Sequence, residues 1–134
     1  MNILFVAGFG PIVNDVQASS KLYIETLGLP LKEESGYFQS ESIEGVKHFG
    51  LWPLSQVASS CFDNDEWPSN LPVPCSWIEY EVEDVAAATS ELQEKGYTLF
   101  VENKTEPWGQ VVTRFLSPEN IITSVVYSPW FHEG

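Results

Sequence analysis

The same order of elements occurs twice along this chain, and this repetition restricts its possible folds more than any other feature. In the first half, residues 3–13 contain two apolar runs typical of a strand. Asp15 then supplies a helix cap for residues 16–27, and Gly28 ends the helix in the way that glycine does at C′. The positions that can form one apolar stripe on this helix are Val16, Leu22, Tyr23 and Leu27. The pattern predicts a strand followed by a helix that packs on a sheet.

The second half repeats this order. Residues 77–82 alternate with a period of two, Asp84 caps a helical pattern over residues 85–95, and Gly96 ends it. Turn residues then separate three short strands after each helix, at residues 29–34, 36–40 and 46–51 and again at residues 97–102, 111–116 and 121–127. Each half is therefore predicted to fold as strand, helix and three strands.

Two such halves predict an α+β protein in which two βαβββ modules form a curled mixed sheet around a cavity. We expect residues 1–134 to form a single domain, with modules at residues 1–53 and 75–134. Residues 54–74 are predicted to be a connecting loop, a lid or a linker, because four prolines between Pro53 and Pro74 disfavour a helix.

Composition excludes several classes of function. With 134 residues, 43% hydrophobic and 19% charged, the chain can form a packed core. A net charge of −13 disfavours nucleic acid and allows a cationic ligand. No apolar run is long enough for a membrane span and no signal peptide is recognisable, so we expect a cytoplasmic protein. Cys61 and Cys75 lack the spacing of a zinc site and are interpreted as buried or unreactive thiols.

Several segments resemble the vicinal oxygen chelate superfamily, which contains glyoxalases, extradiol dioxygenases, fosfomycin-resistance enzymes and bleomycin-resistance proteins. The matching segments are Asp15-Val16 through Tyr23–Leu29, Val82–Val85 through Leu92 and Gly96, Glu106-Pro107-Trp108-Gly109, and Ser117-Pro118-Glu119-Asn120. The resemblance covers nearly the whole chain and implies the glyoxalase/bleomycin-resistance fold.

Enzymes of this superfamily hold a divalent metal with His, Glu or Gln from four strands. Two of the corresponding positions here are Gly8 and Trp77, which cannot bind a metal. The last position falls near Thr123 and Ser124, and a hydroxyl is a poor substitute for a carboxylate. Only His48 remains as a candidate ligand. The sequence therefore predicts neither a metal, nor another cofactor, nor a catalytic residue.

The bleomycin-resistance branch departs from the metal pattern in the same way. Its members are acidic, have about this length, and carry a loop like Pro107-Trp108-Gly109. Their two chains form a cleft at the dimer interface, where aromatic rings hold the drug and carboxylates neutralise its cationic tail. The resemblance implies a homodimer that binds a cationic or aromatic small molecule without transforming it, as in antibiotic resistance.

Eight residues are candidates for binding such a ligand, because they are aromatic, acidic or close to such residues: Trp108, Trp52, Trp67, Phe38, His48, Asp63, Asp65 and Glu66. Core packing is the alternative for the aromatic residues, and a solvated acidic loop is the alternative for the three carboxylates.

Two carboxylates allow a different hypothesis. Glu79 and Glu81 point to the same side of their strand, and we expect that side to face water. If the metal ligands are displaced, these residues and His48 would belong to a glyoxalase- or dioxygenase-like metalloenzyme. In a third hypothesis, the acidic surface serves a protein partner or solubility. His132, close to the end of the chain, is expected to lie in a frayed tail.

Overall fold

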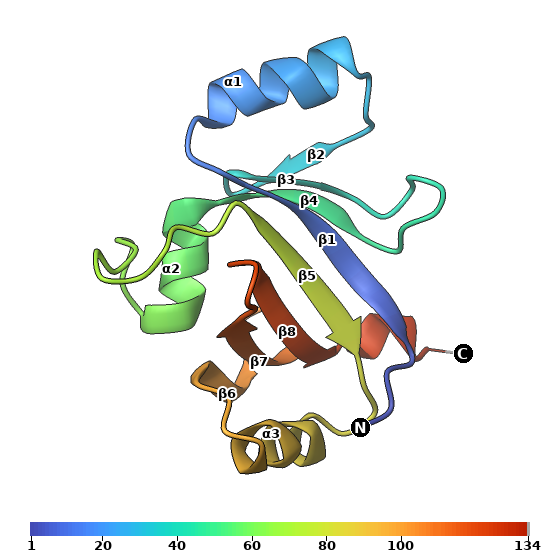
Figure 1. The fold of residues 1–134 in the computed structure, drawn as a ribbon. Helices are drawn as coiled ribbons and strands as arrows, with labels where there is room; N and C mark the ends of the chain where they lie inside the picture. The colour runs from blue at the N-terminus through green and yellow to red at the C-terminus, as the bar shows by residue number, and fades with distance from the viewer. Residues whose placement is uncertain (134) are drawn as a thin grey trace.

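All eight strands belong to one mixed sheet, which we describe from a computed structural model of residues 1–133 (Figure 1). The strands are β1 (Phe5–Val13), β2 (Lys32–Glu34), β3 (Tyr37–Ser40), β4 (Phe49–Pro53), β5 (Ser76–Glu81), β6 (Leu99–Thr105), β7 (Val111–Leu116) and β8 (Ile122–Tyr127). The helical segments are α1 (Val16–Ser20), η1 (Lys21–Thr26), α2 (Leu54–Phe62), α3 (Val85–Glu94) and η2 (Pro129–Phe131). None of the helices in these residues has the length and apolar composition needed to cross a bilayer.

The two halves of the chain meet at the centre of the sheet. The strand order is β2-β3-β4-β1-β5-β8-β7-β6, with β1 antiparallel to β5. On either side of this pair, β1 runs parallel to β4 and β5 runs parallel to β8. The outer strands β2 and β6 each pair on one side only, so the sheet is not closed. The predicted α+β class with a mixed sheet is confirmed.

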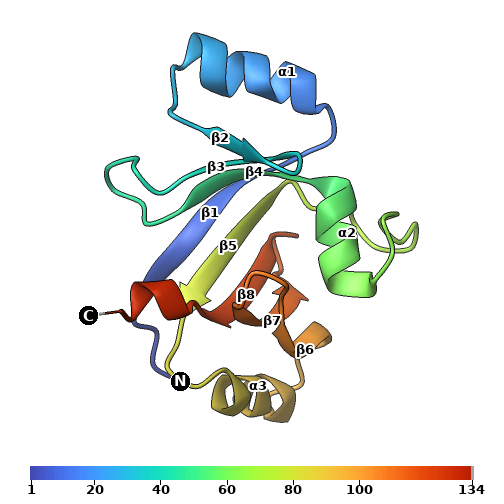
Figure 2. The ribbon, with the colours of Figure 1, turned by 180° about the vertical axis from the view of Figure 1, so that it is seen from behind.

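The helices α1 and α3 lie at opposite ends of the molecule (Figures 1 and 2) and differ in how they pack. In α3, Asp84 accepts the capping hydrogen bond from Ala87 N, and one face is buried against β6, β7 and β8. No residue of α1 or η1 is buried, and Leu22 and Leu27 are 47% and 57% exposed. Val16 and Tyr23 are half-buried, so the predicted apolar stripe is wrong for Leu22 and Leu27. In η1 the hydrogen bonds widen to i→i+5, as from Leu27 N to Leu22 O, which departs from the 3.6-residue period.

A helix, α2, interrupts the predicted connecting loop. It begins directly after Pro53 and ends at Asp63, which adopts a left-handed conformation at φ 56°. The prolines stand outside the helix, at its start and beyond its end, where they do not break hydrogen bonds. Val57, Ala58, Ser60 and Cys61 are buried. The prediction of an irregular loop was therefore wrong for residues 54–62.

The main core lies on the face of the sheet that α2 covers, which we call the inner face. It contains residues from both halves and from α2: Ala7, Trp52, Val57, Cys61, Trp77, Val101, Val112, Ile122 and Val126. A second core lies under α3 on the other face: Val82, Val85, Ala88, Leu92 and Val125. Because side chains alternate along a strand, residue parity in β5, β7 and β8 determines which face a side chain joins.

The close approach of β1 and β4 requires glycine. A Cβ atom added to Gly10 would overlap the carbonyl oxygen of Gly50, which is backbone and cannot move aside. We expect Gly10→Ala to lower the free energy of unfolding by about 3 kcal/mol, measured by urea denaturation. Val6→Ala, on the same strand at a 42% exposed position, is the control and should change stability by less than about 1 kcal/mol. Equal effects would contradict this account.

Candidate functional site

The inner face of the sheet contains a cavity of about 750 Å³. Residues from both halves of one chain and from α2 line it. Its aromatic lining residues are Tyr37, Trp52, Trp77, Trp108, Trp130 and Phe131. Its charged lining residues are Glu34, Glu41, Asp63, Glu79, Glu106, Lys104 and Arg114. The cavity is therefore an aromatic pocket with an excess of carboxylates.

The pairing register places polar residues in a row across the middle of the sheet. Glu79 on β5 is the partner of Ser124 on β8, and Ser124 is the partner of Arg114 on β7. On the other side, Glu79 faces Gly8 of β1. Arg114 is the only arginine of the chain, and it is fully buried. The row brings a cation and a carboxylate together on the inner face.

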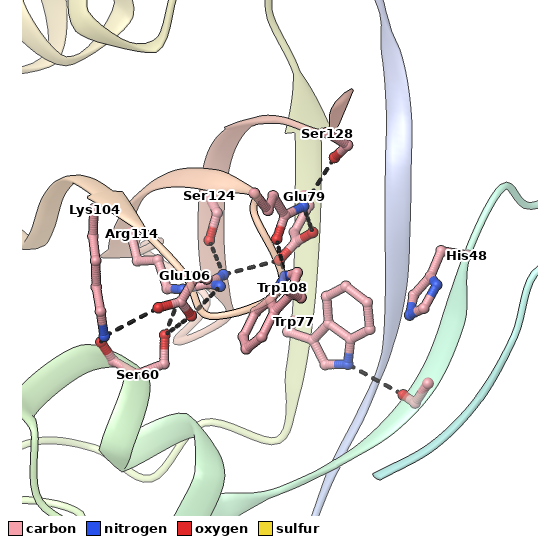
Figure 3. A network of polar contacts seen from close by, with 12 residues as sticks. His48, Ser60, Trp77, Glu79, Lys104, Glu106, Trp108, Arg114, Ser124 and Ser128 are labelled. Atoms are coloured by element: carbon pink, nitrogen blue, oxygen red, sulfur yellow. Dashed lines mark hydrogen bonds and ion pairs between the residues drawn. The ribbon is translucent and has the colours of Figure 1, made fainter. Parts of the chain in front are cut away.

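Four side chains surround the Arg114 guanidinium (Figure 3). Its Nη1 donates to Glu79 Oε2 and to Ser124 Oγ, both at 2.9 Å. Its Nη2 donates to Glu106 Oε2 at 3.3 Å, and its Nε donates to Ser60 Oγ of α2 at 2.9 Å. Ser60 Oγ in turn donates to Glu106 Oε2 at 2.8 Å. We call these five residues the arginine network.

The arginine network is electrically balanced once Lys104 is counted with it. Burial by itself would lower the pKa of Arg114, but the carboxylates of Glu79 and Glu106 outweigh it and raise that pKa above its usual value. Glu106 also pairs with Lys104 at 3.0 Å, so two carboxylates face two cations. The guanidinium carbon lies 4.9 Å from the centre of the Trp52 ring, which supports it from the first half of the chain.

A second polar chain lies on the first-half wall of the cavity. The Tyr37 hydroxyl is 2.6 Å from His48 Nε2, and His48 Nδ1 is 3.2 Å from Glu41 Oε2. Because the Glu41 carboxylate can only accept a hydrogen bond, a neutral His48 donates from Nδ1 to Glu41. Its Nε2 then accepts a hydrogen bond from the Tyr37 hydroxyl. Burial raises the pKa of Tyr37 well above its usual value, so this phenol stays protonated and acts as a donor.

The structure brings four of the eight predicted binding residues into the cavity lining: Trp108, Trp52, His48 and Asp63. The other four do not line it. Phe38 follows Tyr37 on β3, so alternation places it on the opposite face. Trp67 packs between Phe62 and Phe100 and donates its indole N–H to the Pro72 carbonyl. Asp65 and Glu66 are exposed in the loop after α2.

Three expectations about polar residues were wrong. Glu79 and Glu81 share one side of β5, but that side is the inner face rather than the solvent side. Glu81 is fully buried and accepts from Ser128 N and from His132 Nε2, the latter at 2.7 Å. His132 also stacks on Tyr127 at 4.2 Å, so it is anchored rather than frayed.

Sequence reasoning missed Arg114, Glu106 and Gln110, which are all buried. A signal for Arg114 exists in its strand. The chain's only arginine lies two residues from Val112 and two from Leu116, so all three side chains share one face. A buried arginine requires carboxylate partners. Which carboxylates supply them depends on the register of distant strands.

The residues present do not fit a divalent metal. In residues 1–133, no three His, Cys, Asp or Glu side chains lie close enough together to hold one. Glu79 and Glu106 are occupied by fixed cations, and both ring nitrogens of His48 are hydrogen bonded. At the expected ligand position on β8, Ser124 accepts from Arg114. A dication here would face the guanidinium, which repels it.

The fold and the position of the cavity define the class of protein. The family model of the Glyoxalase/Bleomycin resistance protein/Dioxygenase superfamily matches residues 9–123. The chain belongs to this superfamily, in agreement with the resemblance of its motifs. A search of curated proteins gave no match.

Solved structures share the fold at low sequence identity. A superfamily member from Vibrio splendidus 12B01 aligns over 90% of this chain and 96% of its own, with 14% identity and a TM-score of 0.58. A variant of Streptomyces coelicolor methylmalonyl-CoA epimerase, in complex with 2-nitronate-propionyl-CoA, aligns over 95% and 99%, with 15% identity and a TM-score of 0.58. NAD-dependent benzaldehyde dehydrogenase from Legionella pneumophila aligns over 90% and 96%, with 11% identity and a TM-score of 0.61. These similarities establish the fold alone.

Removing the Arg114 charge should destabilise the protein strongly. We expect Arg114→Met to lower the free energy of unfolding by about 3–5 kcal/mol, because it leaves Glu79 without its cation and Glu106 with Lys104 alone. Lys95→Met, which removes a largely exposed cation, is the control and should cost less than about 1 kcal/mol. Urea denaturation at pH 7.5 measures both variants, and equal losses for Arg114→Met and Lys95→Met would contradict the charge explanation.

The two thiols should differ in reactivity. Burial raises the pKa of Cys61 to about 11, whereas Cys75 is exposed. At pH 8 we expect a disulfide reagent to titrate one thiol per native chain rapidly and none in Cys75→Ser. Because only the unfolded chain loses the Cys61 proton near its ordinary pKa, this thiol should lower stability as the pH rises through that range. Rapid labelling of both thiols would contradict this assignment.

Proposed function

We propose that this protein is a metal-free binding protein of the bleomycin-resistance type, which holds a cationic aromatic small molecule and performs no chemistry on it. The observation that carries the proposal is the lining of the inner cavity, where aromatic rings occur together with an excess of carboxylates. Binding of a flat cation requires both features and no reactive group.

The aromatic residues supply walls of different kinds. Trp52 and Trp77 are buried at the base, with ring centroids 5.8 Å apart in an edge-to-face arrangement. Trp108 is 54% exposed although it belongs to the cavity lining. A large ring held at a cavity and left open to solvent can gain contact area when a ligand stacks on it.

The charges favour a cation over an anion. Five carboxylates and two cations line the cavity, a net charge of −3 when His48 is neutral. Arg114 and Lys104 compensate Glu79 and Glu106, so Glu34, Glu41 and Asp63 carry the excess. The negative charge of these three residues attracts a cationic ligand, and salt weakens this attraction.

The ionisable groups of the cavity are engaged in ways that leave no activated nucleophile. Arg114, Lys104, Glu79 and Glu106 neutralise one another. The Tyr37 hydroxyl stays protonated and donates a hydrogen bond to His48. This arrangement supports binding rather than the metalloenzyme hypothesis, for which His48 and Glu79 would have to be free ligands.

The wider organisation proposed for this function follows the superfamily. We propose that the two halves act as paired βαβββ modules, because the order of strand, helix and three strands occurs in both. We also propose a cytoplasmic homodimer. One chain provides both walls of the cavity, so a partner chain would add to the site rather than create it.

Titration with two planar probes tests the function. We expect calorimetry to detect binding of ethidium, a cation, and at least tenfold weaker binding of phenanthridine, its neutral core, because only the cation gains from the carboxylates. Trp108→Ala should weaken ethidium binding by about tenfold or more. Tyr97→Ala, which truncates an exposed ring outside the cavity lining, is the matched control and should change nothing.

Other outcomes of this experiment would overturn the proposal. Equal affinity for the two probes would show that the carboxylates do not select a cation. A purified protein with about one divalent metal per chain and metal-dependent turnover would establish an enzyme instead. If Trp108→Ala and Tyr97→Ala have equal effects, the probe does not occupy the inner cavity.

A further inference from the structure

Trp108 is exposed, but hydrogen bonds within its own turn fix its orientation. It lies on a tight turn between β6 and β7, where Glu106 N donates to the Gln110 carbonyl and Gly109 N donates to the Glu106 carbonyl, both at 2.8 Å. Gly109 has a φ of 95°, which favours glycine. The indole Nε1 of Trp108 donates to Gln110 Oε1 at 3.0 Å. Backbone bonds thus fix the turn, and one side chain anchors the ring.

The anchoring amide of Gln110 is buried and fully used. Besides accepting from Trp108, it donates from Nε2 to Glu79 Oε1 at 3.0 Å and to Ser128 Oγ at 2.9 Å. Gln110 is only 4% exposed. The orientation of the amide is determined by chemistry, because an indole N–H can only donate and a carboxylate can only accept. A flipped amide would place the Gln110 NH₂ group against the Trp108 N–H, and the Gln110 oxygen against the Glu79 carboxylate.

This amide connects the exposed ring to the arginine network. Glu79 accepts a hydrogen bond from Gln110 at one carboxylate oxygen and from Arg114 at the other. Glu79 is therefore held on two sides, and Gln110 is held by Glu79 and Ser128. The chain of contacts runs from a fully buried cation to an indole that is 54% exposed.

We propose that Gln110 is a positioning residue that presets Trp108 as a wall of the inner cavity, through its contact with the Glu79–Arg114 pair. This inference rests on the proposed binding function. Gln110 does not need to touch the ligand for this role. Its contribution is to fix the ring before binding, so that the ligand does not bear the entropic cost of ordering it.

The first test needs no ligand. The ¹H–¹⁵N spectrum contains indole signals from five tryptophans, and Trp108→Phe assigns the one that disappears. In Gln110→Met, a variant of similar shape without the amide, we expect the Trp108 indole proton to shift and to exchange with solvent about tenfold faster. The other four indole signals should keep their exchange rates. An unchanged Trp108 signal in a folded variant would overturn the proposal.

The second test is a double-mutant cycle with ethidium. Gln110→Met should weaken binding by about tenfold in the otherwise unaltered chain and by less than about twofold when Trp108→Ala is already present. A general structural role for Gln110 predicts equal losses in both backgrounds, and that result would overturn the proposal. If ethidium does not bind the unaltered protein, the proposed function fails, while the indole measurement still decides the role of Gln110.

Gln110→Glu separates positioning from packing through its dependence on pH. Near neutral pH the new carboxylate faces Glu79, with Arg114 as the nearest cation, and the repulsion should release Trp108. At lower pH the protonated side chain can donate to Glu79 and accept from Trp108, as the amide does. We therefore expect the Trp108 indole shift to approach its unaltered value on acidification. A shift equally displaced at every pH at which the variant stays folded would contradict this mechanism, and thermal unfolding defines that range.

Discussion

A single buried guanidinium determines how the inner face of this protein is organised. Arg114 cannot lose its proton in any ordinary environment, so its burial requires negative partners in place. Glu79, Glu106 and Ser60 come from β5, the β6–β7 turn and α2, and each must be correctly placed for the charge to be satisfied. The helix α2 is thereby fixed to the second half, while Trp52 supplies a ring from the first half. One charge thus links both halves and the segment that joins them.

The same charge determines what the cavity can offer to a ligand. A carboxylate that is already hydrogen bonded to a guanidinium has little remaining attraction for a second cation. The deep carboxylates Glu79 and Glu106 therefore serve the fold, and the carboxylates of Glu34, Glu41 and Asp63 remain available. The cavity separates into a neutral polar base and acidic positions nearer the first half and α2. Aromatic side chains of both regions, from Tyr37 to Trp108, line the space between them.

Local patterns predicted the elements, whereas the site depends on contacts between distant ones. Alternation, turn residues and helix caps placed eight strands and α3 close to their observed positions, because these signals lie within a few residues of one another. The helix α2 was missed because its prolines lie just outside it. Glu79 was assigned to solvent because its burial becomes favourable only with Arg114, which is 35 residues away in sequence. A single sequence does not contain the register that joins them.

The arginine network also opposes a metal site on this face of the sheet. A metal ligand introduced at Gly8 or Ser124 would lie beside Glu79 in the same row across the sheet. That carboxylate could bind a dication only after leaving Arg114, and the freed guanidinium would then remain buried next to the new charge. A metal site therefore requires removal of Arg114 together with new ligands, and removal of Arg114 alone costs a large share of the stability of a typical domain. The buried cation therefore opposes a divalent metal on this face of the sheet, whichever ligands are added around it.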